Sequence, residues 1–350
     1  MKAELFDYML PADLIASHPA KRRDGSRLIV VDPASGQITH ARMEDLVSHL
    51  PPGSLLVAND TRVIPARLRA QRPTGGAVEV LFVRPVDGDE RSCRWNALAR
   101  ANKPLRVGDP IDLGFGLGAR VERKLDRGQV ELVVNRAQKE LRDHLEMHGE
   151  VPLPPYIKRA PVIEDRERYQ TVYAHHDGSV AAPTAGLHFT PELIDAVGEV
   201  GCEICYVTLH VGPGTFRPIT TENLEDHEMD EEYFSISAST VAAVNDGIER
   251  GRPIIAVGTT VIRTLEGSFA RSGRLEESQG FTRIFISPPF EFRVANGLLT
   301  NFHLPRSTLL CLVCAMAGRE LIMAAYEEAV SRRYRFYSYG DAMLILPGKR

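Results

Sequence analysis

The sequence contains little cysteine, little lysine and no long apolar run, and each shortage excludes a class of protein. Five cysteines in 350 residues are too few for a disulfide scaffold, and their odd number favours reduced thiols. The longest uncharged apolar run, residues 307–318, is shorter than the roughly 18–20 residues that a membrane helix needs. Glu4 and Asp7 stand where a secretory signal would be apolar. These absences predict a soluble, cytoplasmic protein.

Two Cys-x-x-Cys pairs invite a zinc interpretation that their surroundings oppose. Cys202 and Cys205 lie in a strand-like segment, where an offset of three places the thiols on opposite faces. Cys311 and Cys314 lie in an apolar, helical segment and are typical of a core. We therefore expect no four-cysteine zinc site.

The charge balance excludes a uniformly basic nucleic-acid coat but leaves room for a local basic patch. The formal net charge is −4 and the isoelectric point is about 6.3. Of the 42 basic residues, 35 are arginine and 7 are lysine, and arginine binds phosphates and stacks on bases better than lysine does. A hydrophobic content of 43% with 25% charged residues is that of an ordinary globular protein.

Short apolar runs alternate with helical segments in two parts of the chain, which predicts an α/β fold with a mostly parallel or mixed sheet flanked by helices. Between about residues 67 and 134 the pattern changes to short alternating runs separated by Gly, Asp and Pro turns. That spacing predicts an inserted small antiparallel β-barrel domain. We predict a discontinuous α/β catalytic domain of residues 1–66 and 150–350, and a barrel domain of residues 67–149.

Individual elements follow from the same patterns. Thr190 and Pro191 begin a helix that ends near Gly201, and Gly258-Thr259-Thr260 begins another. The apolar, glycine-bearing segment 113–118 lacks a following helix, so we interpret it as a turn and not a nucleotide-binding loop. Other predicted elements are strands at 27–31, 54–58, 202–211, 253–257, 282–287 and 342–346, and helices at 239–250 and 307–330.

Polar junctions near strand ends and helix starts are the candidate sites, because ligands of α/β sheets collect there. They are residues 59–62, 183–189, 210–215, 258–260, 301–305 and 338–341. Each has a plain structural explanation: a single histidine is more often a hydrogen-bonded core residue than a catalyst, and Gly-Thr-Thr is more often a simple cap. Six such junctions in one chain favour function over chance.

Two further functions remain open from the residues alone. A metal-dependent hydrolase could use His188, His210, His227 and Asp226, although the acidic stretch around His227 fits no zinc spacing well. A non-catalytic RNA-binding module could use the barrel as its platform. Arginines interleaved with tyrosines and phenylalanines suit single-stranded RNA; the residues that we predict to contact nucleic acid are Arg62, Arg67, Lys158, Arg159, Arg168 and Arg335.

Taken together, these segments resemble the S-adenosylmethionine:tRNA ribosyltransferase-isomerases of the queuosine pathway. The likeness runs from near residue 4 to near residue 346. The stretches that carry it are residues 59–68, 148–158, 178–190, 207–212, 256–260, 299–305 and 334–345. The chain departs from the family pattern at Pro213, Asp230, Pro289 and Asn296, and Asp230, which replaces a common histidine, weakens any essential role for a histidine there.

The resemblance implies an α/β domain with an inserted barrel, and transfer of the ribosyl part of S-adenosylmethionine to 7-aminomethyl-7-deazaguanine at the tRNA wobble position. Adenine and methionine leave, and epoxyqueuosine is the product. It implies no permanently bound cofactor, S-adenosylmethionine as co-substrate, a modified tRNA as partner, no membrane, no obligate protein partner and a monomer. We expect no metal ligands.

Chemistry narrows the candidate residues, because a sulfonium acidifies the neighbouring 5′ C–H, and expelling adenine needs a proton donor. Histidine is the natural acid or base near neutral pH, and a strongly cationic pocket would repel the sulfonium. Which residue is the acid and which the base stays open. The predicted catalytic residues are His188, His210, His303 and Asp60, and the predicted S-adenosylmethionine-binding residues are Gly258, Thr259, Thr260, Arg263, Glu266 and Gly212.

Overall fold

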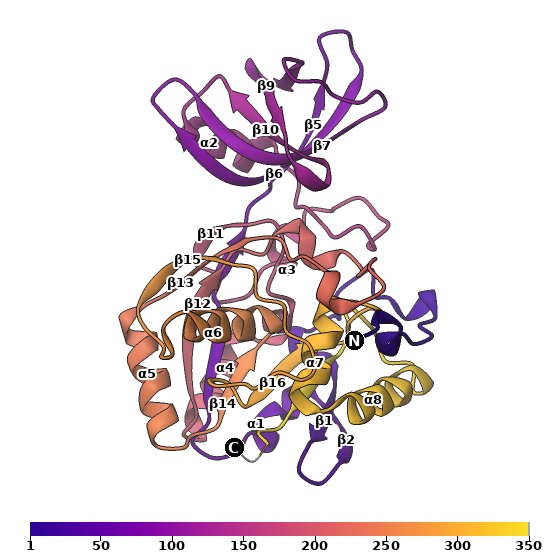
Figure 1. The fold of residues 1–350 in the computed structure, drawn as a ribbon, viewed down its shortest axis with the longest axis vertical. Helices are drawn as coiled ribbons and strands as arrows, with labels where there is room; N and C mark the ends of the chain where they lie inside the picture. Colours follow the sequence, from indigo (N-terminus) through magenta and orange to yellow (C-terminus); the bar gives the residue numbers. More distant parts are fainter. Residues whose placement is uncertain (349–350) are drawn as a thin grey trace.

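A nine-stranded mixed sheet forms the larger part of the molecule in the computed structural model, which describes residues 1–348 (Figure 1). The strand order is β15-β13-β12-β3-β14-β16-β17-β1-β2. Four neighbouring pairs are parallel and four are antiparallel. The strands are β1 (Arg27–Asp32), β2 (Gln37–Arg42), β3 (Leu55–Asn59), β12 (Glu203–Leu209), β13 (Glu232–Ile236), β14 (Ile254–Val257), β15 (Ser278–Thr282), β16 (Gly297–Asn301) and β17 (Ala342–Ile345).

Helices cover both faces of this sheet, which confirms the predicted α/β class. Successive residues of a strand point to opposite faces, and the central strand β14 is apolar throughout: Ile254 and Ala256 pack into one core cluster, and Ile255 and Val257 into another. The first cluster contains α6, α7 and α8, and the second contains α1 and α4. The helices are α1 (Leu46–His49), α2 (Gln138–His148), α3 (Asp165–Arg168), α4 (Pro191–Glu199), α5 (Ala238–Glu249), α6 (Thr259–Ser272), α7 (Thr308–Ala317) and α8 (Arg319–Ser331).

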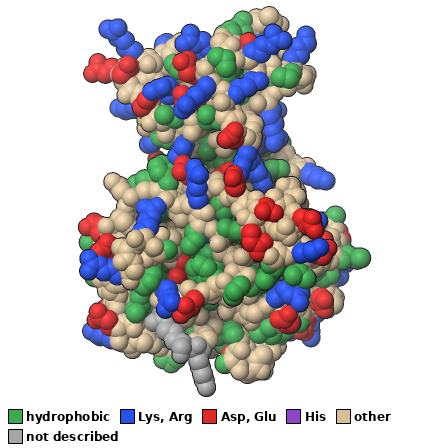
Figure 2. All heavy atoms as spheres, in the orientation of Figure 1, with side chains coloured by type: hydrophobic (Ala, Val, Ile, Leu, Met, Phe, Trp, Pro, Cys, Tyr) green, Lys and Arg blue, Asp and Glu red, His purple; other side chains and the backbone are tan. Residues whose placement is uncertain are grey.

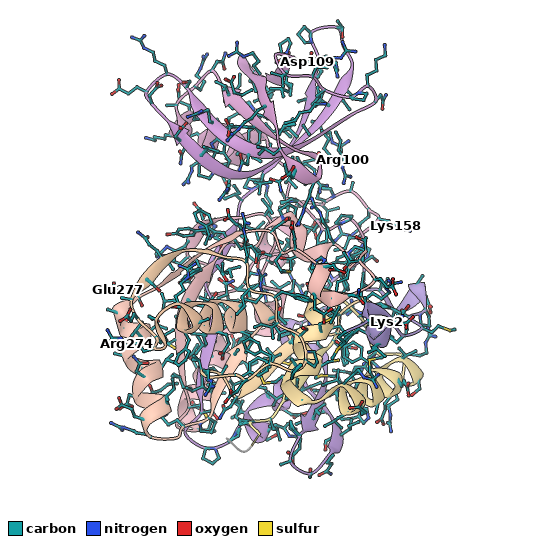
Figure 3. All side chains as sticks on the ribbon, viewed as in Figure 1. Lys2, Arg100, Asp109, Lys158, Arg274 and Glu277 are labelled. Atoms are coloured by element: carbon teal, nitrogen blue, oxygen red, sulfur yellow. The ribbon has the colours of Figure 1, made fainter. Side chains whose placement is uncertain are left out.

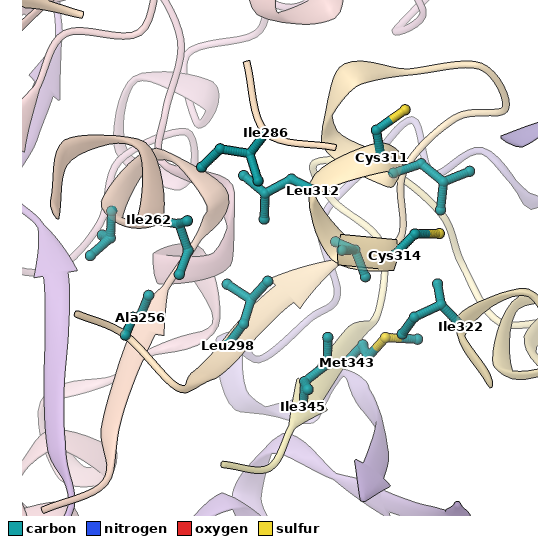
Figure 4. Packing of buried hydrophobic residues seen from close by; sticks show 14 of the residues in the cluster. Ala256, Ile262, Ile286, Leu298, Cys311, Leu312, Cys314, Ile322, Met343 and Ile345 are labelled. Atoms are coloured by element: carbon teal, nitrogen blue, oxygen red, sulfur yellow. The ribbon is translucent and has the colours of Figure 1, made fainter. Parts of the chain in front are cut away.

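The first cluster brings cysteines into an apolar interior, as the sequence predicted for Cys311 and Cys314. Both lie on α7, beside Leu298 of β16 and Met343 of β17 (Figure 4). Burial raises the pKa of Cys311 to about 12. These thiols therefore act as packing groups and not as metal ligands or nucleophiles.

A closed six-stranded antiparallel barrel stands apart from the sheet, as predicted (Figure 1). Phe82 and Trp95 meet edge to face in its interior, with ring centroids 5.9 Å apart. The glycine-bearing segment 113–118 forms the turn between two of its strands, with Phe115 at φ 53°. The barrel strands are β5 (Arg67–Gln71), β6 (Ala77–Gly88), β7 (Cys93–Ala101), β8 (Pro110–Gly114), β9 (Leu117–Lys124) and β10 (Gln129–Val134).

The chain enters and leaves the barrel region at adjacent points. The backbone N–H of Arg67 donates to the carbonyl of Glu150 at 3.2 Å, and the N–H of Glu150 donates back at 2.8 Å. Gly149 lies so close to the carbonyl of Pro65 that a Cβ there would come within 1.8 Å of the oxygen. A short two-stranded sheet, β4 (Thr61–Val63) with β11 (His176–Ser179), lies next to this crossing.

Two predicted elements are wrong in detail. The long helix expected over 307–330 is two helices, because Gly318 adopts φ 86° and the chain bends by 117° between α7 and α8. The strand expected at 282–287 lies earlier in the chain, at Ser278–Thr282, and Ile284 and Ile286 pack against the core from the loop that follows it. Strands β13 and β16 were not predicted.

No single helix within residues 1–348 is long and apolar enough to cross a membrane. Helices α7 and α8 reach the required length and composition only when they are counted together across their bend.

Candidate functional site

A pocket lies where the chain leaves the carboxyl ends of β14 and β16, two parallel neighbours in the sheet. This is the edge at which ligands of α/β sheets bind. The lining combines small, apolar and hydroxyl side chains, and His303 is its one imidazole. The lining residues are Ala182, Pro183, Thr184, Ala185, Val211, Thr215, Gly258, Thr259, Thr260, Thr300, Asn301, Phe302, His303, Leu309, Tyr337 and Ser338.

The start of α6 forms one wall of the pocket, which places Gly258, Thr259 and Thr260 as the sequence led us to expect. Gly258 has φ 100°, a conformation that favours glycine, and its N–H donates to the carbonyl of Leu299 at 2.8 Å. The hydroxyl of Thr260 accepts a hydrogen bond from the Asn59 amide at 3.2 Å. The positive end of the α6 dipole therefore faces the pocket.

His303 is a buried, neutral imidazole in the pocket wall. Its Nε2 lies 2.9 Å from the Thr300 hydroxyl, and its backbone N–H donates to Tyr326 Oη at 3.0 Å. Burial lowers the pKa of His303 to about 3. At neutral pH the ring therefore carries no charge, and it can hold a hydrogen bond without repelling a cation.

His188 lies behind the pocket and does not line it. Its Nε2 lies 3.1 Å from Nδ2 of Asn301, which does line the pocket. Burial lowers the pKa of His188 to about 4, and only 4% of its surface is exposed. The ring therefore reaches the pocket through Asn301.

His210 occupies a third position, beside the crossing into the barrel. Its Nδ1 lies 2.8 Å from the Thr61 hydroxyl, and its ring stacks on Tyr233. A Cβ on Gly178, which has φ 150°, would come within 2.6 Å of His210 Nε2, so this packing requires glycine. Burial lowers the pKa of His210 to about 4. The expectation that the three predicted catalytic histidines share one pocket is therefore wrong, because only His303 lines it.

Asp60 faces a second recess, on the β12–β13 side. Its Oδ1 accepts a hydrogen bond from the Thr208 hydroxyl at 2.7 Å, and His176 lies 3.7 Å from its Oδ2. Burial is the main cause that raises the pKa of Asp60. Hydroxyls of Ser235, Ser237 and Thr240 share this recess.

A buried carboxylate, Glu232, fixes the loop that carries Thr215 into the pocket. Its Oε1 accepts hydrogen bonds from the Gly212 N–H at 3.0 Å and from the Thr215 hydroxyl at 2.7 Å. Its Oε2 pairs with Arg263, and both side chains are 2% exposed. The predicted ligand-binding groups Gly212 and Arg263 are therefore engaged with Glu232.

Glu266 is likewise engaged within the protein. Its carboxylate accepts backbone hydrogen bonds from Arg293, Val294 and Ala295 at 3.0–3.2 Å. It does not line the pocket. The geometry thus gives it the task of holding the loop before β16.

The predicted nucleic-acid residues divide into exposed side chains and tethered ones. Arg62 and Lys158 are exposed, and Lys158 lies on the segment just below the barrel (Figure 3). Arg67 borders a cleft between the barrel and the sheet and donates to the carbonyl of Leu153 at 3.1 Å. The guanidinium groups of the remaining three, Arg159, Arg168 and Arg335, bind carboxylate or carbonyl oxygens of the chain itself.

Within residues 1–348, no group of three or more His, Cys, Asp or Glu side chains has the geometry to hold a metal ion. The alternative metal set is dispersed: His188 contacts Asn301, His210 contacts Thr61, and His227 meets the ring of Phe285. The hydrolase alternative therefore has no structural support.

Sequence reasoning missed Asn301, Thr215 and Glu232. Asn301 and Thr215 stand in segments that it singled out, but the histidine and the glycines of those segments drew the functional interpretation. Glu232 ends an acidic stretch that reads as a solvated turn. A single carboxylate beginning an alternating apolar strand was the available signal.

Comparison with known proteins finds relatives that match nearly the whole chain. A family model described as queuosine biosynthesis protein matches residues 3–345. An S-adenosylmethionine:tRNA ribosyltransferase-isomerase of Citrifermentans bemidjiense is 51% identical over 340 residues, which is 97% of this chain and 98% of the relative. One of an Anaeromyxobacter species is 48% identical, with 99% of each chain covered.

A solved structure shares the fold. The crystal structure of an S-adenosylmethionine tRNA ribosyltransferase from Thermotoga maritima is 36% identical in sequence and covers 98% of this chain and 100% of its own, with a TM-score of 0.55.

Proposed function

This chain belongs to the family of queuosine biosynthesis proteins, and we propose that it transfers and isomerises the ribosyl group of S-adenosylmethionine onto 7-aminomethyl-7-deazaguanine at the wobble position of a tRNA. Adenine and methionine leave, and epoxyqueuosine forms. S-adenosylmethionine acts as a co-substrate, with no permanently bound cofactor. The observation that carries the proposal is identity of 48–51% over nearly the whole chain with enzymes of this name.

The pocket at α6 suits a sulfonium substrate. Lys, Arg, Asp and Glu are absent from its lining, so no fixed cation repels the positive sulfur. Burial keeps the His303 ring neutral there, so it does not repel the sulfonium, and its lowered pKa makes it a weaker base than a free imidazole. The proposal gives the proton transfers to His303, which lines the pocket, whereas the ring of His210 lies against Thr61 and Tyr233, outside that lining.

The other predicted groups lie at different places around the pocket. Asp60 faces the recess on the β12–β13 side, where its carboxylate accepts a hydrogen bond from Thr208. The first residues of α6, Thr259 and Thr260, offer a polar end of S-adenosylmethionine the backbone N–H groups of a helix start, next to Gly258. His188 contributes through Asn301.

The barrel suits a polyanionic partner. Residues 67–149 contain 16 Lys and Arg against 12 Asp and Glu, a net charge of +4, whereas the whole chain carries −4. Basic side chains are frequent on the barrel face that Figure 2 shows. A basic surface of this kind attracts tRNA phosphates.

A basic cleft leads from the barrel toward the pocket. Arg67, Arg100, Arg127 and Arg217 line it together with Glu79, Val180 and Pro213, and Arg100 lies on the barrel rim that faces the sheet (Figure 3). Val180 and Pro213 each stand two residues before a residue of the pocket lining, Ala182 and Thr215 respectively. An anticodon loop held in the cleft would therefore bring its wobble base next to the pocket.

The test is release of free adenine from S-adenosylmethionine in the presence of a tRNA that carries 7-aminomethyl-7-deazaguanine. We expect adenine and the modified tRNA to form in equal amounts, and no adenine with an unmodified tRNA. Binding of the modified tRNA without adenine release would favour a non-catalytic RNA-binding module and overturn the proposal.

A further inference from the structure

Asn301 presents a buried acceptor with no partner. Its side chain lines the pocket and is 2% exposed, and its Oδ1 has no hydrogen-bond partner among residues 1–348. A buried carbonyl oxygen without a partner is costly, and native proteins avoid it unless a ligand or water completes the bond.

The hydrogen-bond partners of Asn301 allow only one orientation of its side-chain amide. Its Nδ2 donates to the carbonyl of Tyr337 at 3.3 Å, and lies 3.1 Å from Nε2 of His188. His188 itself hydrogen-bonds the backbone of Arg23, an interaction that stabilises its protonated ring nitrogen, so Nε2 is left as an acceptor. Both partners of Nδ2 are therefore acceptors, and reversing the amide would place oxygen against oxygen.

This arrangement leaves Oδ1 as the polar atom that Asn301 offers to the pocket. His188 acts here as a positioning residue: it keeps the amide turned so that the acceptor, and not the NH2 group, meets a ligand. The pocket therefore selects for a hydrogen-bond donor on its occupant.

The character of the lining indicates which part of the substrate supplies that donor. Phe302, Leu309, Val211 and Tyr337 contribute apolar surface, and no carboxylate or guanidinium lines the pocket to pair with the charged ends of a methionine. A neutral nucleoside fits such a lining better than an amino acid does.

We propose that Asn301 Oδ1 accepts a hydrogen bond from an N–H or O–H donor of the nucleoside of S-adenosylmethionine, held in place by His188. This inference rests on the proposed function and deepens it. Two donors share the required chemistry, the 6-amino group of adenine and the ribose hydroxyls, and the experiment separates them.

The probes are thioether inhibitors, which lack the sulfonium and cannot react: S-adenosylhomocysteine, its analogue without the 6-amino group, and its 2′-deoxy and 3′-deoxy analogues. Inhibition constants are measured against adenine release with modified tRNA. We expect one analogue to bind the unsubstituted enzyme at least about tenfold more weakly than S-adenosylhomocysteine, because it leaves Oδ1 unpaired. The analogue that loses affinity identifies the donor.

The same four inhibitors are then measured on the Asn301→Ala variant, which completes a cycle of paired changes in enzyme and ligand. We expect S-adenosylhomocysteine to bind this variant more weakly than it binds the unsubstituted enzyme. The ratio of the inhibition constants of the discriminating analogue and S-adenosylhomocysteine should fall to about one. Asn245→Ala serves as the matched control: Asn245 lies on α5, and its amide donates to the Leu275 carbonyl outside the pocket. This control should retain the full discrimination.

Each outcome decides the inference. Equal inhibition by all four compounds on the unsubstituted enzyme overturns the role of Asn301 while adenine release still supports the proposed function. Discrimination that survives in Asn301→Ala also overturns it, since another group must then read the donor. Absence of adenine release from the unsubstituted enzyme overturns the proposed function and this inference together. The unsubstituted-enzyme comparison does not depend on whether a variant folds.

Discussion

At the scale of single residues, burial decides what the polar side chains can do. His188, His210 and His303 are all kept neutral at physiological pH because burial lowers their pKa values to about 4, 4 and 3. A neutral imidazole next to a sulfonium is compatible with binding, whereas an imidazolium is not. These three imidazoles therefore act through hydrogen bonds and not through fixed charge at physiological pH.

The lowered pKa of His303 makes stability depend on pH in a definite direction. The unfolded ring binds a proton near pH 6.5 and the folded ring near pH 3, so between these values the unfolded state holds more protons. The free energy of unfolding should therefore fall with decreasing pH, by about 1.4 kcal/mol per pH unit from this group well below pH 6.5.

Urea unfolding of His303→Gln between pH 6 and 4 measures this contribution. We expect the variant's stability to change less steeply with pH by about one proton. His18→Gln, at an exposed position, is the control and should follow the unsubstituted protein. Identical slopes for all three proteins would refute the neutral, buried state of His303.

At the scale of elements, the carboxylate of Glu232 joins β13, the start of α6 and the loop 212–215. Removing its charge would leave the Arg263 guanidinium, which is 2% exposed, without a counter-charge, and breaking a buried ion pair in this way costs about 3–5 kcal/mol. The Thr215 hydroxyl would also lose its fixed position in the pocket wall.

We therefore expect Glu232→Gln to unfold at clearly lower urea concentration and to lose kcat/KM for adenine release. Glu276→Gln, which removes an exposed partner of Arg274, should change stability by less than about 1 kcal/mol. Partial recovery of stability in the double variant Glu232→Gln/Arg263→Gln would attribute the loss to the uncompensated guanidinium. An unchanged unfolding midpoint in Glu232→Gln would show that the network does not hold the loop.

Local sequence signals were sufficient for elements that have local causes. The Thr190 cap accepts the Leu193 N–H at 3.1 Å and begins α4 as predicted, and the start of α6 at Thr259 was likewise correct. Elements set by distant contacts were not: β13 pairs with β12 and β15 across the sheet, and its acidic approach looks like a loop when it is read alone.

The candidate site shows the same division. Residue type and position near strand ends identified His303 and the glycine and threonines of residues 258–260, because these follow from chain order in an α/β sheet. They could not reveal that Glu266 and Arg263 are bound within the protein, since their partners lie 27–31 positions away along the chain. Nor could they show that Asn301 stands between His188 and the pocket, a relation made by packing.

At the scale of the whole molecule, charge is divided between the barrel and the sheet. Phosphate contacts along the cleft should make tRNA binding weaken with salt, and each lost contact should reduce the slope of log affinity against log salt by about 0.7–0.9. Lys158 offers the cleanest test, because it is exposed near the cleft.

We expect Lys158→Ala to weaken tRNA binding and flatten the salt dependence by that amount. Arg67→Ala should do the same, with an added loss from its hydrogen bond to Leu153. Arg274→Ala, at a position remote from the barrel (Figure 3), is the control and should leave the slope unchanged. Filter binding at several salt concentrations measures all three, and equal slopes throughout would refute the phosphate path.

The reciprocal hydrogen bonds between Arg67 and Glu150 hold the two ends of the barrel segment side by side. A unit whose first and last residues are immediate neighbours can be spliced into a surface turn of an older protein without disturbing what surrounds it. The surrounding protein needs to accommodate only one crossing point, where Gly149 packs against the carbonyl of Pro65. The barrel is therefore joined to the sheet at one place, where the two ends of its segment meet.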